Sequence, residues 1–310
     1  MQYTRSRLFT LVWAGIFMLA LLGTAAAQSP DSEEQDRSGP RATNRSSHTT
    51  DQFKGFNEYE EFQGAVTSSE GIFKLDSTLG YDFNRYAGVF VGVPLYFVND
   101  FSADSGSGAG DVCFGLELYA PVEVVRYSTS FTVSAPTGSV SKGFSTGHRT
   151  LDWTNRLRKR FGRLTPFLTA GLSNTVPDTD LVTRTFTSLG NVVHLEEGAD
   201  FDLTKHVYAG ASGYHIIPFG NQEVFNRFNG TTSTKADNAN RGPGSDDQPS
   251  ASGNDLTREN GFNTWLGFEP TRVLRIELGY SRSMTFQVNR GSVNVGLNVG
   301  RMLRSLGHQD

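Results

Sequence analysis

Apolar and polar residues alternate along much of the chain, and the alternation is cleanest between Phe73 and Phe83. The apolar side chains there belong to Phe73, Leu75, Leu79, Tyr81 and Phe83, and they interleave with Lys74, Asp76, Thr78, Gly80 and Asp82. Because successive side chains of an extended chain point to opposite faces, a period of two predicts a strand with one oily face and one wet face. The same pattern recurs along the chain and favours an all-β fold.

Twelve strands are predicted from this pattern. Their expected ranges are 57–66, 71–83, 86–98, 111–120, 122–135, 149–160, 164–175, 189–203, 207–217, 258–269, 273–283 and 291–301. Pro94 interrupts one strand, because proline lacks a ladder donor, and 207–217 alternates only weakly. The predicted fold is a transmembrane antiparallel up-and-down β-barrel of about 12 strands over residues 56–301, with 10 to 14 strands compatible with the pattern.

The connections between the predicted strands alternate between short and long. Tight turns are expected at 84–85, 120–121, 161–163, 204–206 and 270–272. Long loops are expected at 99–110, 136–148, 176–188 and 218–257, with shorter connections at 67–70 and 284–290 on the same side. Outer-membrane barrels have short periplasmic turns and longer extracellular loops, whereas a soluble sandwich with Greek-key connections gives no reason for this asymmetry. An even number of strands places both ends of the barrel in the periplasm.

One parity of the predicted strands is apolar and is expected to face lipid. It includes Ala87, Val89, Val91, Val93, Leu95, Phe97, Val112, Phe114, Leu116, Leu118, Val125, Tyr127, Phe131, Val133, Leu151, Trp153, Leu157, Leu274, Ile276, Leu278, Tyr280, Val293, Val295, Leu297 and Val299. Aromatic residues such as Tyr81, Phe83, Tyr86 and Phe268 fall near strand ends, at the level that suits lipid headgroups.

The opposite parity carries charges of both signs and is expected to line the lumen. Its candidate selectivity residues are Lys74, Asp76, Asp82, Glu117, Arg126, Asp152, Arg156, Arg158, His194, Glu196, Asp200, Asp202, Glu269, Arg275 and Glu277. Charged rings of this kind select solutes in a channel, or they pair across strands and plug a narrow barrel. The arginines either meet an anionic solute or hold acids such as Asp152, Glu196 and Glu277 in a ladder of salt bridges.

The N-terminal segment has the order of a secretory signal. Arg5 and Arg7 precede an apolar run over 8–22 and a small-residue site that ends at Ala27. Residues 1–27 are therefore predicted to be a signal peptide cleaved after Ala27, followed by a disordered periplasmic leader over 28–55, and residues 302–310 a C-terminal tail. No second apolar run is long enough for a spanning helix, so membrane insertion must use strands. The expected location is a bacterial outer membrane.

Composition narrows the partners. The net charge of −4 speaks against nucleic-acid binding, and the single Cys113 excludes an intramolecular disulfide framework. The mean hydropathy of −0.36 suits a barrel, in which only the outer face must be apolar. The expected partners are outer-membrane lipid, small-molecule solutes of unknown identity and the outer-membrane assembly machinery, and no cofactor is implied.

Catalytic and metal-binding interpretations are weaker. Ser145, His148 and Asp152 are three common residues around one loop, and a catalytic triad is set by geometry. His194 shares its parity with three acids, but spacing along a strand spreads them too far for one metal shell. The Gly-rich 104–111 leads into a strand, so no phosphate-binding loop follows. The loop 218–257 is predicted to be disordered and extracellular, and a barrel enzyme remains a less favoured alternative to a channel or a plugged surface-interaction barrel.

Three segments resemble a known family: GDVCFGLELYAP, FTVSAPTGSVSKGFSTGHRTLDW and FGRLTPFLTAGLSN. In them Gly110 and Asp111 open a strand, Ala135 to Gly138 form an Ala-Pro-Thr-Gly exit, and Phe161-Gly162 forms a turn. These features resemble the bacterial outer-membrane β-barrel family described as transporters of the MetA pathway of phenol degradation, over roughly residues 57–301. The resemblance implies a barrel that passes small, often hydrophobic, molecules, and it supplies no catalytic residues.

Overall fold

The structure, a computed structural model, describes residues 55–66, 70–100, 106–121, 125–176, 178, 184, 186–227, 257–271, 273–299 and 302–303. The predicted signal peptide and nearly all of the predicted leader lie outside these residues, as do most of the predicted loop 218–257 and most of the C-terminal tail. Among the described residues, no helix has both the length and the apolar character needed to cross a membrane.

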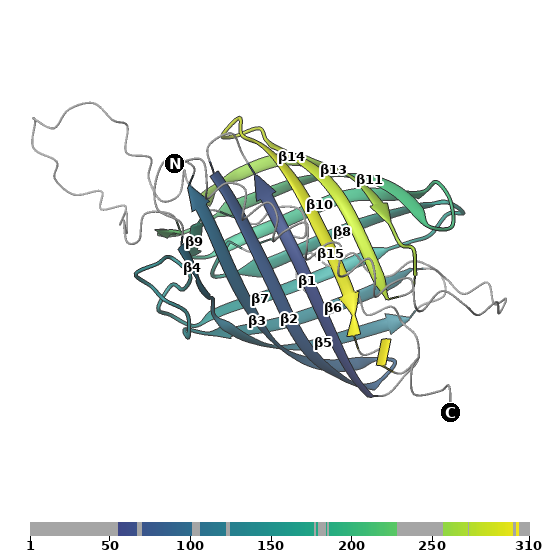
Figure 1. Ribbon diagram of the computed structural model, residues 1–310, viewed down its shortest axis with the longest axis horizontal. Helices are drawn as coiled ribbons and strands as arrows, with labels where there is room; N and C mark the ends of the chain where they lie inside the picture. The colour runs from purple at the N-terminus through teal and green to yellow at the C-terminus, as the bar shows by residue number, and fades with distance from the viewer. Residues whose placement is uncertain are drawn as a thin grey trace, which may run out of the picture.

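The described chain is built of antiparallel strands (Figure 1). The strands are β1 (Gly55–Val66), β2 (Glu70–Asn84), β3 (Ala87–Asp100), β4 (Gly106–Ala109), β5 (Val112–Pro121), β6 (Arg126–Ala135), β7 (Thr150–Arg158), β8 (Leu164–Ser173), β9 (Phe186–Leu189), β10 (Val192–Asp202), β11 (Val207–Pro218), β12 (Glu223–Asn226), β13 (Glu259–Phe268), β14 (Leu274–Ser283) and β15 (Asn289–Asn298). Each of the twelve predicted strands corresponds to one of these, within a few residues.

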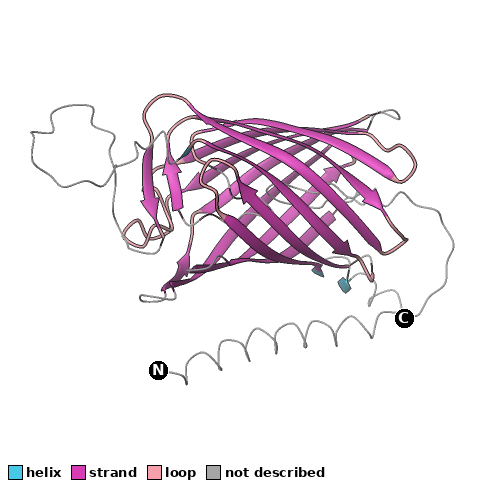
Figure 2. Cartoon of the chain, turned by 90° about the horizontal axis from the view of Figure 1, so that it is seen from above, coloured by secondary structure: helices cyan, strands magenta, loops and turns pink. Residues whose placement is uncertain are grey.

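The large sheet closes on itself. Its strands pair in the order β2-β1-β15-β14-β13-β11-β10-β8-β7-β6-β5-β3, and β2 also pairs with β3. The ends of the described chain meet in the β1–β15 pair, where Tyr59 opposes Asn298 and Val66 opposes Gly291. The fold is therefore a closed antiparallel barrel of twelve strands, counting β4 and β5 as one interrupted strand, as predicted (Figure 2).

The interruption between β4 and β5 lies beside Pro94. β3 pairs with β5 as far as Gly92 and with β4 from Leu95 onward, and the carbonyl of Pro94 accepts a hydrogen bond from Gly110 N–H at 2.8 Å. In an antiparallel ladder the N–H and C=O of one residue point to the same neighbour, so the donor that proline lacks falls at this break. Pro94 therefore lies at a position where the strand pairing does not use a backbone N–H donor.

The two ends of the barrel differ as predicted. Short connections lie at one end, between β2 and β3, β7 and β8, β10 and β11, and β13 and β14, and we call it the short-turn end. The long connections lie at the other, the long-loop end. Three of them were wrongly predicted to lack strands, because β4 lies in the expected loop 99–110, most of β9 in the expected connection 176–188 and β12 in the expected loop 218–257. β12 pairs with β9, which falls at the end of the expected connection 176–188, so two separate loops form a small sheet.

The apolar parity of the strands differs from the polar parity in its exposure. The apolar parity is largely exposed on the outer surface, as at Phe114, Leu151 and Leu278, which are 55–56% exposed. Leu274 and Val295 lie in outward rows but are buried; Val295 is flanked in register by Phe62 and Ile276. The outside of the barrel is therefore an apolar belt, and the polar parity turns inward.

Aromatic rings lie flat against the inner wall, over glycines. A Cβ added to Gly210 would meet the Trp265 ring at 2.2 Å, and one added to Gly267 would meet Tyr208 at 2.1 Å. Gly115 lies in the same way beneath Phe90, at 2.0 Å. Because a glycine has no side chain, it leaves a hollow that a large ring on a neighbouring strand fills.

Candidate functional site: a polar network across the lumen

The predicted lumen residues lie on the inward parity of their strands. Lys74, Glu117, Arg156, Arg158, Asp200 and Glu277 are buried, and Asp76, Asp82, Arg126, Asp152, His194, Glu196, Asp202 and Arg275 are partly buried. Glu269 follows the end of β13, and its N–H donates to His206 O at 2.8 Å. Their roles in selectivity stay a prediction.

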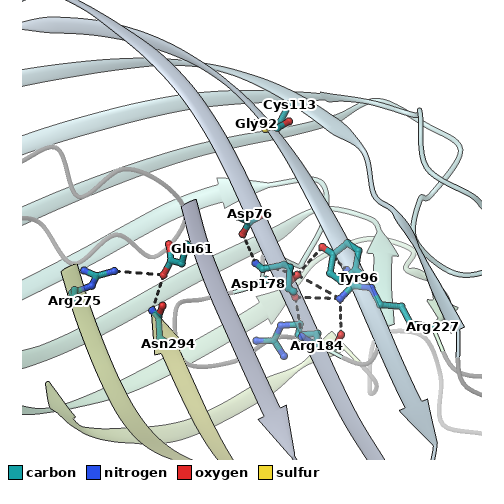
Figure 3. A network of polar contacts seen from close by, with 11 residues as sticks. Glu61, Asp76, Gly92, Tyr96, Cys113, Asp178, Arg184, Arg227, Arg275 and Asn294 are labelled. Atoms are coloured by element: carbon teal, nitrogen blue, oxygen red, sulfur yellow. Dashed lines mark hydrogen bonds and ion pairs between the residues drawn. The ribbon is translucent and has the colours of Figure 1, made fainter. Parts of the chain in front are cut away.

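Asp178, in the connection between β8 and β9, reaches the wall of β2 and β3 (Figure 3). Its carboxylate accepts a hydrogen bond from the Tyr96 hydroxyl at 3.0 Å and lies 3.8 Å from the Lys74 ammonium. Arg227, just after β12, approaches the same carboxylate at 3.4 Å and places its guanidinium 4.2 Å from the centre of the Tyr96 ring. Lys74 also pairs with Asp76 at 2.9 Å.

Arg184 links this group to the other side of the barrel. Its backbone N–H donates to Asp178 at 2.9 Å, its carbonyl accepts from Arg227 at 2.5 Å, and its guanidinium pairs with Glu259 of β13. Glu259 also accepts from Tyr214 of β11 at 2.9 Å.

Arg290 of β15 completes the pairing of Glu259, at 3.2 Å. Around the barrel, β13 and β3 are separated by β14, β15, β1 and β2, so they lie nearly opposite each other. We call Lys74, Tyr96, Asp178, Arg184, Arg227 and Glu259 the latch, because their contacts join two loops to nearly opposite walls.

The charge state of the latch is set by its cations. Burial by itself raises the pKa of Asp178, but the neighbouring Arg227 and Lys74 outweigh burial and lower that pKa below its ordinary value. The pKa of Arg227 is raised by Asp178 and Tyr96, against the effect of burial. Asp178 is therefore ionised and Arg227 protonated at neutral pH.

A third loop packs beside the latch. Phe144, in the connection between β6 and β7, is 3% exposed and stacks on Tyr96 with 5.6 Å between ring centroids. Ala65, Ile72 and Val98 complete this apolar cluster. An aromatic stack of this kind holds the Tyr96 hydroxyl in place for its hydrogen bond with Asp178.

A second polar cluster lies toward the short-turn end. Arg158 pairs with Asp200 at 2.8 Å, and the Trp265 indole donates to the same carboxylate at 3.0 Å. The Arg156 and Arg158 guanidinium groups lie 5.7 and 5.9 Å from the centre of the Phe167 ring. These contacts connect β7, β8, β10 and β13 across the inner wall.

The acids predicted as partners of the arginines have other contacts. Asp152 meets His194 at 3.1 Å, Glu196 accepts from Ser212 at 2.7 Å, and Glu277 accepts from Tyr208. Arg275 instead lies 3.5 Å from Glu61 of β1. The alternative in which the arginines hold these acids in a ladder of salt bridges stays a prediction.

Ser145, His148 and Asp152 do not form a catalytic triad. The Ser145 hydroxyl accepts from Gly147 N–H at 3.0 Å, His148 is exposed, and Asp152 faces His194 instead. Among the residues that the structure describes, no group of three or more His, Cys, Asp or Glu side chains is placed to hold a metal ion.

Several residues of the latch were missed by the strand pattern. Asp178, Arg184 and Arg227 lie in long connections, where no periodicity marks an inward side chain. The inward facing of Glu259 and Arg290 could have been predicted, because they share the inward parity of Asn263 and Asn294 in their own strands.

Solved structures of outer-membrane proteins are similar to this chain. An outer membrane channel from Pseudomonas putida F1 is similar to this chain with a TM-score of 0.52 and 10% identity, over 79% of this chain and 95% of that one. The KdgM porin, in complex with disordered oligogalacturonate, gives a TM-score of 0.45 and 8% identity, over 77% and 98%. No family profile matches the chain and no curated protein matches it in sequence, so the resemblance to the phenol-degradation family is not confirmed.

Proposed function

We propose that this protein is a channel of a bacterial outer membrane that passes small-molecule solutes and is closed in this structure by the latch. The observation that carries the proposal is the closed barrel with an apolar belt outside and charged side chains of both signs inside. Such a barrel satisfies its backbone within lipid and offers solutes a polar interior. The outer membrane channel of similar fold supports the same location and role.

The latch explains how such a barrel is shut. Two long loops supply Asp178, Arg184 and Arg227, and the barrel wall supplies their partners. Because the loops are joined to the wall by ion pairs rather than by continuous strands, they are the part that moves with least loss of structure. Opening requires the Asp178 and Glu259 contacts to break.

A plugged barrel that acts through its surface is the second candidate. The extensive ion pairing within the lumen favours it, since paired charges close a narrow barrel without any need for passage. In that case the loops at the long-loop end would make the contacts with a binding partner.

Single-channel recording in planar bilayers separates the two candidates. The parent, Asp178→Asn and a control, Asp202→Asn, are compared, because Asp202 pairs with the half-exposed Arg160 at the short-turn end. For a channel, we expect discrete conductance steps whose open probability rises at least tenfold in Asp178→Asn and stays at the parent level in the control. Insertion of all three without conductance would leave the plugged barrel as the function.

A further inference from the structure

The inner wall of β13, β14 and β15 carries six buried polar atoms for which the described part of the chain provides no hydrogen-bond partner. Two of them, Arg275 Nε and Glu277 Oε2, belong to charged groups that have other contacts, and the other four are Asn263 Oδ1, Ser281 Oγ, Ser292 Oγ and Asn294 Oδ1. The four residues are 0–8% exposed. Buried polar groups are ordinarily paired with protein, ordered water or a ligand, so four uncharged orphans on three adjacent strands mark a place where a bound molecule can supply the partners.

The register gathers these atoms around Gly279. Ser292 is the direct partner of Gly279, Asn263 is the partner of Ser281, and Asn294 is the partner of Glu277. Residues two apart on a strand share a face, so all four side chains are lumen-side neighbours of the glycine, together with Trp265, its direct partner on β13, and Glu277. Neighbouring rows lie about 4.8 Å apart across strands and about 6.6 Å apart along them.

The two asparagines are held so that their oxygens remain available. The Asn263 amide donates to Ser212 Oγ at 3.1 Å, and the Asn294 amide donates to Glu61 Oε1 at 2.6 Å (Figure 3). Once the nitrogen of an amide is engaged, its oxygen points away from that partner and accepts only. The patch therefore presents two fixed acceptors and two hydroxyls that either donate or accept.

The chemistry of the patch selects a neutral ligand. All four atoms are uncharged, and the charged groups on the same wall have partners of their own: Glu61 pairs with Arg275, Glu259 pairs with Arg290, and one oxygen of Glu277 accepts from the Tyr208 hydroxyl. The other oxygen of Glu277 lies beside Asn294 and adds one further acceptor for a hydroxyl group. Several hydroxyl groups on one small molecule supply donors and acceptors at the spacing of the rows. We propose that this patch is a binding subsite for a neutral polyhydroxylated solute, a polyol or a monosaccharide. The inference rests on the proposed channel, because the solute reaches the buried patch only when the latch opens.

Equilibrium binding to the purified protein in detergent tests the subsite, with D-mannitol and D-glucose as probes. The test variant is Ser281→Ala with Ser292→Ala, and the matched control is Ser128→Ala with Ser130→Ala, on the inward row of β6. Titration calorimetry is run on the parent, the test variant and the control variant, each with and without Asp178→Asn. We expect saturable binding that is stronger with Asp178→Asn, at least tenfold weaker in the test variant and unchanged in the control.

Because the two test hydroxyls have no partner among the described residues, their loss leaves the thermal midpoint within the range of the control. Absence of saturable binding in both backgrounds, equal affinities in test and control variants, or preferential binding of ethylammonium or acetate would each overturn the subsite. The assay needs no ion flow. Binding without conductance would therefore keep the subsite and remove the channel, whereas conductance without binding would remove only the subsite.

Discussion

At the scale of single residues, Asp178 shows how one carboxylate joins distant parts of the chain. It contacts the Tyr96 hydroxyl, the Arg227 guanidinium and the backbone N–H of Arg184, with Lys74 at 3.8 Å. Each contact stabilises its ionised form, which is why its pKa is lowered despite burial. The protonation state of this carboxylate therefore controls the latch.

The lowered pKa of Asp178 gives the latch a defined pH dependence. The folded state favours the ionised form, so the stabilisation is complete above the ordinary pKa of 3.8 and is lost as pH falls through the lower, folded-state value. We expect parent conductance to stay low from neutral pH down to about pH 4 and to rise only below that. Asp178→Asn should conduct at all of these pH values, and opening of the parent near pH 6 would contradict the assignment.

The outward facing of Leu278 has an energetic consequence. Leu278 is 56% exposed in the middle of β14 and would contact lipid. Leu278→Arg should destabilise the folded barrel by about 2 to 4 kcal/mol, whereas Leu278→Ala should cost far less. Equilibrium unfolding in lipid vesicles measures both. If the arginine variant is as stable as the alanine variant, this face does not contact lipid.

At the scale of elements, pairs of rings and glycines hold neighbouring strands together. Trp265 of β13 lies over Gly210 of β11 and reaches Asp200 of β10, so one side chain connects three strands. Tyr208 in turn lies over Gly267 and donates to Glu277. These interlocked contacts stabilise the wall and keep bulky side chains flat against it.

Substitution of Gly210 tests this arrangement. A Cβ in Gly210→Ala would lie 2.2 Å from the Trp265 ring, so the indole must leave the wall and its hydrogen bond with Asp200 must break. We expect a loss of about 1 to 3 kcal/mol in stability and a red-shifted emission from Trp265. The measurement uses a background with Trp13→Phe and Trp153→Phe, so that the emission comes from Trp265. Gly220→Ala, where a Cβ meets nothing within 4 Å but φ is +77°, shows the effect of backbone strain alone. Unchanged emission from Gly210→Ala would mean that the ring lies elsewhere.

At the scale of the whole molecule, closure of the sheet removes every free edge from the barrel. The pairing of β1 with β15 joins the two ends of the described chain, from Tyr59–Asn298 to Val66–Gly291. Backbone groups in lipid must be satisfied within the protein, so an open edge there is expensive. Stability of the barrel is consequently a property of all twelve strands together.

Removal of β15 tests this cooperativity. A chain that ends at Val288 would leave β1 and β14 as open edges, and we expect it to lose the compact form that resists sodium dodecyl sulfate without boiling. Gel mobility before and after boiling makes the comparison. A control that lacks only residues 304–310 should keep the resistant form; resistance of the shorter chain would show that closure is not required.

Much of the barrel was predictable because its facing pattern is local. The alternation from Phe73 to Phe83 marks a strand by itself, and the inward position of Lys74 follows from parity alone. The latch was not predictable in this way, since Asp178 and Arg227 are 49 residues apart in sequence and lie in connections without a period. Nor did parity reveal that Arg275 faces Glu61, 214 residues away.

The sequence by itself therefore determined the all-β barrel of about twelve strands, the apolar and polar faces of most strands and the asymmetry between short and long connections, because a strand in a barrel repeats every two residues whatever its neighbours are. Only the tertiary structure decided which charges meet, that β9 and β12 join two loops, and that four polar atoms converge around Gly279. Those outcomes depend on the register of paired strands and on closure of the sheet, which bring together residues that no local pattern relates.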